Sequence, residues 1–355
     1  MDLIALRQML HQIPEIAFAE TKTKALLLHT LLGLIPISDP AWKLIEFQHS
    51  NGILISYTIC DQPYRLFRAD MDALPISESS GCDYPSQHQG FMHACGHDIH
   101  MTVLIGLIAQ IVEQKPQRNL LFLFQPAEEG QGGAQAILAE GIIQQHTIDS
   151  AIALHVASEM PVGTISSKSG VFFGIPQEFD VRFFGKAAHV AFPEKGINAL
   201  EAGVDFIESI REQLKPLQAS NRLIFHVGKM TSGTIRNVIA DTCILEGTHR
   251  TLGSEIRDRI NELIHTTSSS SAAKYGATAR IDLLCSYDAV VNNATLVEEL
   301  VEVCKTKNID YIPAETAMTG EDFGFFTTLY PGLLFWLGSG AKHPLHSEKF
   351  LPDSA

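Results

Sequence analysis

Residues 93–100, His-Ala-Cys-Gly-His-Asp-Ile-His, hold the densest group of chemically reactive side chains in the sequence. Histidine, cysteine and aspartate bind first-row metals or orient the residues that bind them. The run that follows, 98–114, has apolar residues at helical spacing, and Gly96 permits a tight turn before it. We therefore predict a loop that brings metal ligands to the start of a buried helix. The alternative is a glycine-containing loop whose histidines only cap that helix.

The overall composition describes an ordinary globular chain. Its 355 residues are too many for one small domain, and the 45% hydrophobic content provides an ample core. The formal net charge of −14 disfavours binding to nucleic acid or to an anionic membrane surface. The six cysteines are scattered, which suits a reducing compartment. Because the sequence has no run of about 18 apolar residues and no signal region, we expect a soluble, cytoplasmic protein.

Three strand-like runs in the first half of the chain lead to ionisable side chains. A run that is apolar on both faces, such as 119–125, is typical of a parallel sheet covered by helices. These runs and their polar ends are 64–70 with Asp70, 119–125 with Glu128 and Glu129 just beyond, and 151–155 with His155. In open α/β sheets ligands collect at the carboxyl ends of strands, so we expect these side chains to converge.

The segment 171–284 has a different pattern and is predicted to be a domain inserted into the first. Its order of strand, helix, two strands, helix and strand is that of the ferredoxin-like fold. The expected elements are 180–185, 196–214, 222–230, 242–250, 254–276 and 277–284, and the first helix should bury Ile197, Leu200, Val204, Ile207 and Leu214. Residues 1–170 and 285–355 would then form one discontinuous α/β domain with a mixed, mostly parallel sheet.

Five potential metal ligands come from separated stretches of the predicted α/β domain. They are Cys95, His97, Glu129, His155 and His346. A thiolate, three imidazoles and a carboxylate suit Zn²⁺, Mn²⁺, Co²⁺ or Ni²⁺ better than Ca²⁺ or Mg²⁺. Five ligands exceed the needs of one tetrahedral ion, so we predict two divalent ions that share a bridging ligand. His343 lies close to His346 in the sequence and could take its place.

Glu128 and Glu129 should have different roles, because adjacent residues at a strand end point to different sides. One can bind metal while the other stays unligated, takes a proton from the attacking water and passes it to a leaving amine. Asp70 is expected to hydrogen-bond a ligand or the general base. A simple turn at the end of the strand would also explain Asp70.

The inserted segment offers three further candidates. His189 follows a predicted strand and could stabilise the oxyanion that forms when a carbonyl is attacked. Arg250 could bind a substrate carboxylate through paired hydrogen bonds, and Asn237 is a second substrate-binding candidate. Hydrogen bonding on the surface of the inserted domain would explain Asn237 and Arg250 equally well.

Six motifs make the chain similar to the metal-dependent amidohydrolases that include hippurate hydrolases, auxin-conjugate hydrolases and aminoacylases. The motifs are RADMDALP (68–75), HACGHDIH (93–100), PAEEG (126–130), ALHV (153–156), GKAAH (185–189) and PLHSEKF (344–350). The resemblance implies a metallopeptidase-like catalytic domain, an inserted lid domain that forms a homodimer, and a small N-acylated amino acid as substrate. It also implies that Glu128 is the proton acceptor and Asp70 a second active-site carboxylate, with the five ligands named above.

Three longer runs, LLFLFQPAEEGQGGA, MPVGTISSKSG and AMTGEDFGFF, narrow the resemblance to bacterial members that remove an acetyl group from an acetylated amino acid. A broader N-acyl-amino-acid hydrolase with the same mechanism is the alternative. A non-catalytic binding protein is a third interpretation, but pure binding would need neither Asp70 nor Glu128. Members of the family continue past the Leu-Pro-Asp at 351–353 into a final helix, and the chain departs from the family pattern there.

Overall fold

The structure is a computed structural model that describes residues 1–130 and 132–352. The departure from the family pattern after Pro352 therefore lies outside the described residues. The chain divides into two compact units. The first contains Met1–Phe172, Val290–Thr316 and the segment from Glu321 onward, and the second contains Phe173–Ala289 and Ala317–Gly320. The second unit thus extends past residue 284, where the predicted insert ends, because its last strand continues to Ser286.

The first unit is built on a mixed sheet of ten strands among the described residues. They are β1 (Trp42–Glu46), β2 (Ile53–Tyr57), β3 (Tyr64–Asp70), β4 (Asn119–Gln125), β5 (Ile148–Ala157), β6 (Ile165–Ser167), β7 (Gly170–Phe173), β12 (Val290–Asn292), β13 (Tyr311–Pro313) and β14 (Gly332–Gly338). The order is β1-β2-β4-β3-β5-β14-β12-β7, with β6 joined to β14 and β13 to β6. The central strands β4, β3, β5 and β14 run parallel to one another. Strand β2 is antiparallel to β4, and β1 is antiparallel to β2. The predicted mixed, mostly parallel sheet is confirmed.

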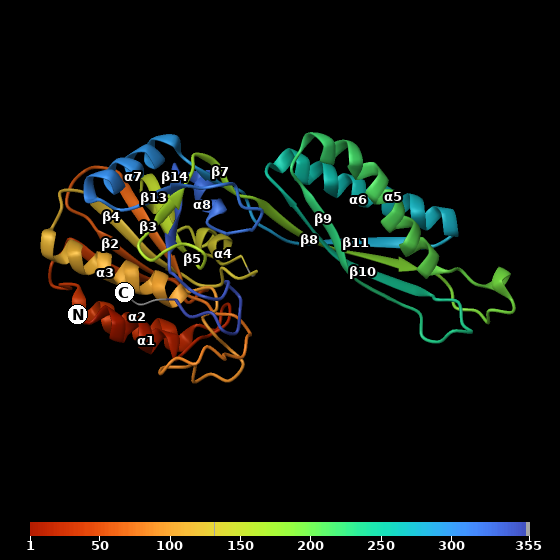
Figure 1. Ribbon diagram of the computed structural model, residues 1–355, viewed down its shortest axis with the longest axis horizontal. Coiled ribbons are helices and arrows are strands. Elements are labelled where there is room, and N and C mark those ends of the chain that lie inside the picture. Colours follow the sequence, from red (N-terminus) through yellow and green to blue (C-terminus); the bar gives the residue numbers. More distant parts are fainter. Residues whose placement is uncertain (131, 353–355) are drawn as a thin grey trace. The chain divides into compact units, whose positions relative to one another are not determined.

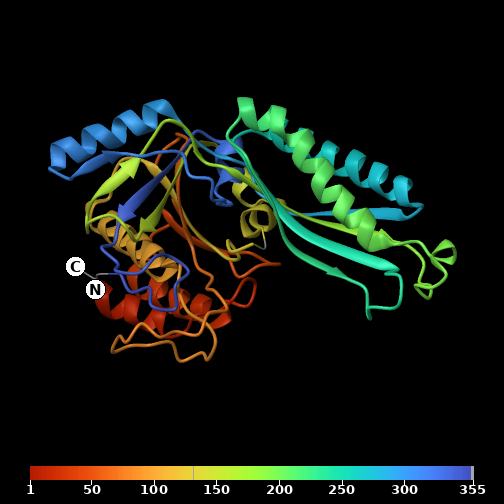
Figure 2. The ribbon, with the colours of Figure 1, turned by 45° about the vertical axis from the view of Figure 1, so that its right-hand side comes forward.

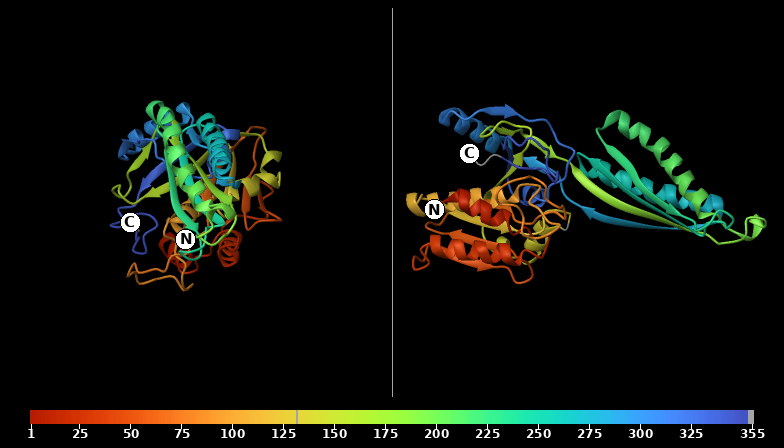
Figure 3. Two further views of the ribbon diagram at one scale, coloured as in Figure 1. Left: turned by 90° about the vertical axis from the view of Figure 1, so that its right-hand side faces the viewer. Right: turned by 60° about the horizontal axis from the view of Figure 1, so that its bottom comes forward.

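Helices α1 (Leu3–His11), α2 (Thr21–Leu34) and α3 (His97–Gln114) cover part of this sheet. Their apolar side chains form one core with β1, β2 and β4, in which Leu10, Leu31, Ile105 and Phe122 are fully buried. Figures 1, 2 and 3 show the three helices, in red and orange, beside one another. Helix α7 (Ala294–Lys307) packs on β14, while the short helices α4 (Gly133–Ala139) and α8 (Gly324–Leu329) lie near β4 and β12.

The loop before α3 is shaped by Gly96. This residue has a φ of 83°, a left-handed backbone conformation that residues other than glycine rarely adopt. A Cβ atom at this position would lie 2.5 Å from Cγ2 of Val156, so the space also excludes a side chain. Helix α3 starts at the next residue, His97, and buries Leu104, Ile105 and Ile108. The predicted loop that opens a buried helix is confirmed.

The second unit has the ferredoxin-like order that its sequence predicts. Its elements are β8 (Ile175–Phe184), α5 (Ala199–Ser220), β9 (Ile224–Ser232), β10 (Thr242–Thr251), α6 (Ser254–Tyr275) and β11 (Thr278–Ser286). The strands form an antiparallel sheet in the order β11-β8-β10-β9. Figures 1 and 2 show α5 and α6 on the same face of this sheet, where Phe183, Phe206 and Ile264 form its core.

The predicted buried side of α5 is correct only in part. Leu214 is buried, but Leu200 is 40% exposed and Val204 is 44% exposed, whereas Phe206 and Ile210 are fully buried. Small residues also face the sheet, and a Cβ atom on Gly203 would lie 2.5 Å from Sγ of Cys243. A prediction based on large apolar side chains overlooks these small residues. Among the described residues, no helix combines the length and the apolar character needed to cross a membrane.

Candidate active site

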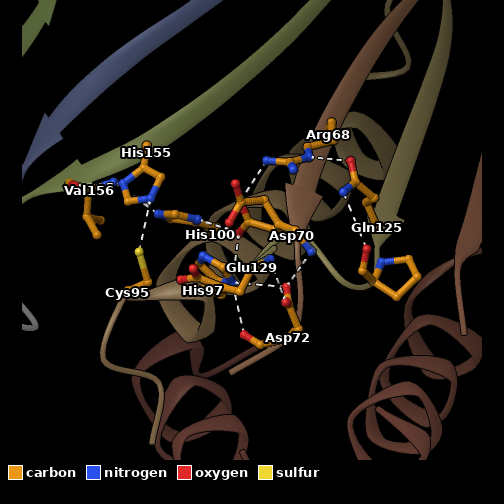
Figure 4. A network of polar contacts seen from close by, with 12 residues as sticks. Arg68, Asp70, Asp72, Cys95, His97, His100, Gln125, Glu129, His155 and Val156 are labelled. Carbon is orange, nitrogen blue, oxygen red and sulfur yellow. Dashed lines mark hydrogen bonds and ion pairs between the residues drawn. The ribbon is translucent and has the colours of Figure 1, made fainter. Parts of the chain in front are cut away.

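Side chains from separate segments of the first unit meet near the carboxyl ends of its parallel strands (Figure 4). Strand β3 ends at Asp70, as predicted, and Asp70 is paired with Gln125 at the end of β4. The prediction that a strand ends at His155 is wrong, because pairing with β14 continues β5 to Ala157. Glu128 and Glu129 are not strand residues either, since they lie in a turn after β4.

All five predicted ligands lie in one cluster. Sγ of Cys95 is 3.4 Å from Nε2 of His155 and 3.3 Å from Nε2 of His346. Nε2 of His346 is also 3.4 Å from Oε1 of Glu129. His97 joins both halves of the cluster, because its ligand atom lies within 4.8 Å of those of Cys95 and His155 and of those of Glu128 and Glu129. Of the two candidate histidines near the C-terminus, it is His346 that makes these contacts.

Backbone carbonyl groups fix the orientation of two ligand histidines. Nδ1 of His97 donates to the carbonyl oxygen of Asp72 at 2.9 Å, and Nδ1 of His155 donates to that of Val156 at 2.8 Å. When such a ring is neutral, its other nitrogen, Nε2, carries the lone pair that a metal ion can bind. Nε2 of His97 is buried and has no hydrogen-bond partner among the described residues. A buried nitrogen in this state is a site for a further ligand such as a metal ion.

The electrostatic field of the carboxylates around the cluster favours a positive charge there. Burial opposes the charged form of His97, but Asp70 and Asp72 outweigh it and raise the pKa of His97 to about 10. Burial and the nearby Glu129 raise the pKa of the Cys95 thiol well above its usual range. Cys95 therefore becomes a thiolate only next to a strong positive charge, which a divalent metal ion provides.

Asp70 is fully buried and is held on both carboxylate oxygens. Oδ2 accepts from Nη1 of Arg68 at 2.6 Å, and Oδ1 accepts from Nδ1 of His100 at 2.6 Å. Burial would raise the pKa of Asp70, but the charges of His100, His97 and Arg68 hold it well below its usual range. Asp70 was predicted to hydrogen-bond a ligand or the general base, but its hydrogen-bond partners here are Arg68 and His100, and Nδ1 of the predicted ligand His97 lies 3.7 Å from its Oδ1.

The sequence interpretation missed two residues of this site, His100 and Asp72. His100 is not placed to bind metal, because Nδ1 donates to Asp70 and Nε2 accepts from the Val156 N–H group at 3.0 Å. The carboxylate of Asp72 accepts the backbone N–H groups of Glu128 at 3.0 Å and of Glu129 at 2.9 Å. Asp72 lies inside the motif RADMDALP (68–75) and His100 inside HACGHDIH (93–100). Their place in these motifs was the signal that could have identified them as site residues.

The two glutamates of this turn have opposite electrostatic environments. Glu128 is only 6% exposed, and burial together with Glu321 and Glu129 raises its pKa well above the usual range. For Glu129, burial is outweighed by the hydrogen bond and charges of His346 and His97, so its pKa is lowered. Glu128 therefore binds a proton more readily than an ordinary glutamate, whereas Glu129 gives up its proton more readily and can act as a ligand.

The three remaining candidates lie in the second unit. His189 is exposed, and its Nδ1 accepts from the Ala191 N–H group at 3.0 Å. Asn237 is also exposed, on a neighbouring loop, and its backbone carbonyl oxygen accepts a hydrogen bond from the Val190 N–H group at 3.1 Å. Arg250 is half-buried on β10 and donates to the hydroxyl of Thr248.

The fold and the cluster are those of a metal-dependent hydrolase, and the comparison with known families agrees. Residues 66–355 match the sequence profile of Peptidase family M20/M25/M40. The match spans well over half of the chain, so the chain belongs to this family. The family resemblance drawn from the six motifs is confirmed.

Individual relatives share nearly the full length of the chain. A protein of Bacillus velezensis named N-acetyldiaminopimelate deacetylase is 39% identical, with 99% of this chain and 93% of that protein covered. The Bacillus subtilis protein of the same name is 37% identical, with 99% and 94% covered. Among solved structures, the Bacillus subtilis YXEP protein, described as a dinuclear metal-binding peptidase of family M20, has a TM-score of 0.83 at 27% identity, with 99% and 92% covered.

Proposed function

We propose that this chain hydrolyses N-acetyl-LL-2,6-diaminopimelate to LL-2,6-diaminopimelate and acetate, a step of lysine biosynthesis. One observation carries the reaction type: a buried glutamate, Glu128, whose raised pKa suits proton transfer, lies beside a cluster of five potential metal ligands. The relatives named N-acetyldiaminopimelate deacetylase, which are 36% to 39% identical over 99% of the chain, support the substrate.

The residues present fit a pair of divalent transition-metal ions. The buried, unpartnered Nε2 of His97 and the thiol of Cys95, together with two further imidazoles and a carboxylate, form a donor set for such ions. Cys95, His97, Glu129, His155 and His346 would hold them. When bound, the ions would supply Lewis-acid polarisation of the amide carbonyl and stabilise the negative charge that develops on its oxygen.

Glu128 would move the proton of the reaction. Its carboxylate takes a proton from the attacking water as the water oxygen bonds to the acetyl carbon. The same carboxyl group then gives that proton to the nitrogen as the carbon–nitrogen bond breaks. The second proton of the water passes from the new acetic acid to the amine, so that acetate and an ammonium group leave. Asp72 fixes the backbone of this turn, and Asp70 fixes His100, so the proton carrier is held in place before substrate arrives.

The second unit would contribute to substrate binding. His189 would stabilise the oxyanion, while Arg250 would bind a carboxylate of the diamino acid and Asn237 would assist. The substrate keeps two carboxylates and one ammonium group, and a chain of net charge −14 repels such an anion unless local cations reverse the field. Arg250 and the metal ions would supply that positive charge.

The second unit would also form a homodimer. Its strand β9 is an outer strand of the sheet, paired only with β10 among the described residues, and an open strand edge can pair with a second chain. Light scattering during gel filtration should then give twice the 39.0 kDa mass of the chain.

A reducing compartment such as the cytoplasm suits the thiol that Cys95 needs as a ligand.

A panel of N-acylated amino acids tests the substrate. With metal-loaded enzyme, N-acetyldiaminopimelate should show a kcat/KM at least about tenfold above those of hippurate, N-acetylmethionine and N-acetylornithine. A site that binds both ends of the substrate loses transition-state stabilisation when the far amino-acid head is missing. If the simple N-acyl amino acids are cleaved equally well, the chain is a general aminoacylase instead.

A further inference from the structure

Arg68 is a fully buried cation that joins three segments of the first unit. Figure 4 shows its contacts with Asp70 and Gln125. Besides Asp70 on its own strand, its Nη2 contacts Oδ1 of Asp322 at 2.7 Å and Oε1 of Glu321 at 3.1 Å. Its Nε donates to Oε1 of Gln125, at the end of β4, at 2.9 Å. One guanidinium group therefore links β3, β4 and the turn before α8.

Asp322 extends this network to the segment after the two glutamates. It is fully buried and accepts a hydrogen bond from Nε2 of Gln125 at 2.8 Å. Its Oδ2 also accepts the backbone N–H group of Ala134, in α4, at 2.8 Å. The turn that carries Glu128 and Glu129 is thus fixed at its start by Asp72 and just after its end by Asp322.

The charges of this network are strongly unbalanced without Arg68. Asp70, Glu321 and Asp322 all contact its guanidinium group, and Glu128 acts on it through its charge. Buried carboxylates without a cation repel one another and move apart or take up protons. Arginine suits this position because its planar fork donates to several acceptors at fixed angles, which lysine cannot do.

We propose that Arg68 and Asp322 form a positioning unit for the hydrolytic reaction. Arg68 holds Asp70, and through Asp70 it sets the ring of His100 and the surroundings of His97. Asp322 holds the first turn of α4, the helix that follows Glu128 and Glu129 in the chain. The Gly-Glu-Asp-Phe motif at 320–323, which has no role in the proposed chemistry itself, thereby gains one. This inference rests on the proposed function, because it names what the unit positions.

Two substitutions test the unit. Arg68→Lys keeps the positive charge but removes the planar guanidinium group with its several N–H donors. Asp322→Asn keeps the volume of the side chain and one acceptor oxygen. Both should lower kcat roughly 10–100-fold, with KM within about threefold of wild type and with unchanged metal content. Arg65→Lys is the matched control on the same strand, since Arg65 is half-buried and contacts Ser150 and Glu299 instead. It should leave kcat unchanged.

A second measurement does not depend on turnover. In protein loaded with Co²⁺, the visible absorption bands report the geometry of the ligands. Arg68→Lys should shift these bands and Arg65→Lys should not. If wild-type protein cleaves no acylated amino acid, the proposed function fails, while the cobalt spectra still decide whether the unit positions the ligands.

Wild-type kcat and wild-type cobalt bands in folded Arg68→Lys and Asp322→Asn would overturn the proposal. A loss of thermal stability alone, with normal kcat in the folded fraction, would also overturn it, because it would show a purely structural network. If Arg68→Lys does not fold, Asp322→Asn decides the question alone.

Discussion

The two units of the molecule hold their candidate residues in different ways. In the first unit they are mostly buried and have fixed partners, as when Asp70 accepts from both Arg68 and His100. In the second unit, His189 and Asn237 are exposed on neighbouring loops. Proton transfer and metal binding need side chains fixed to within a fraction of an ångström, whereas substrate recognition tolerates adjustable loops. Under the proposed function, the first unit would supply the metal ligands and the proton carrier, and the second would supply His189 for the oxyanion together with the residues that bind the substrate.

The largest effect should come from Glu128. Glu128→Gln keeps the shape of the side chain but cannot accept a proton, so kcat should fall roughly 10²–10⁴-fold while metal content stays unchanged. Kinetics and elemental analysis on the same preparation provide both values.

Glu129→Gln is the matched comparison for this variant. Because Glu129 stays ionised and contacts His346, its loss should weaken metal binding at least about tenfold, and excess metal should restore part of the activity. The reverse pattern, with metal lost in the Glu128 variant and kept in the Glu129 variant, would mean that the two roles are exchanged.

A smaller effect on catalysis should come from the second unit. His189→Ala should lower kcat by roughly 10²–10³-fold, the usual effect of removing one oxyanion donor, with unchanged metal content. His226→Ala, at another exposed histidine of the same unit, should change neither value. A His189→Ala variant with wild-type kcat would remove this residue from the reaction and leave the chemical step to the first unit alone.

The smallest effect should appear in stability, through a buried ion network beside the site. His11 contacts Asp98 at 3.0 Å and Glu78 at 3.2 Å, with Arg7 and His93 nearby. Burial opposes a charged His11, but hydrogen bonds with the two carboxylates outweigh it and raise the pKa of His11 from 6.5 to about 10. A raised pKa stabilises the fold fully below the ordinary value, and this contribution is lost as pH rises toward 10.

His11→Gln measures that contribution. The difference in Tm between wild type and this variant should be largest near pH 6 and should shrink steadily toward pH 10. Thermal unfolding followed by circular dichroism at several pH values gives the difference. A constant difference across this range would show that His11 is neutral in the folded protein.

Sequence reasoning predicted the parts that depend on local pattern. The strand that ends at Asp70 and the fully buried β4 follow from runs of apolar residues, and the ligand cluster follows from residue types that few other roles require. The ferredoxin-like order of the second unit was visible because its helices and strands are long.

Other features depend on contacts between distant residues and leave no such pattern. Asp72 acts on backbone N–H groups more than fifty residues away, and His100 receives one from Val156. Arg68 gathers partners from β4 and from the turn before α8, which sequence spacing does not reveal. Part of the buried side of α5 was missed because the small residues Ala202 and Gly203 approach the sheet there beside Phe206 and Ile210.

The central claim is that the cluster of five candidate ligands in the first unit is a metal centre, and elemental analysis tests it most directly. Protein purified without chelator should contain about two transition-metal ions per chain. Cys95→Ser and His97→Ala should each deplete the metal, whereas Cys304→Ser, at a buried cysteine of α7 in the same unit, should not. Unchanged metal content in both the Cys95 and the His97 variants would contradict the account.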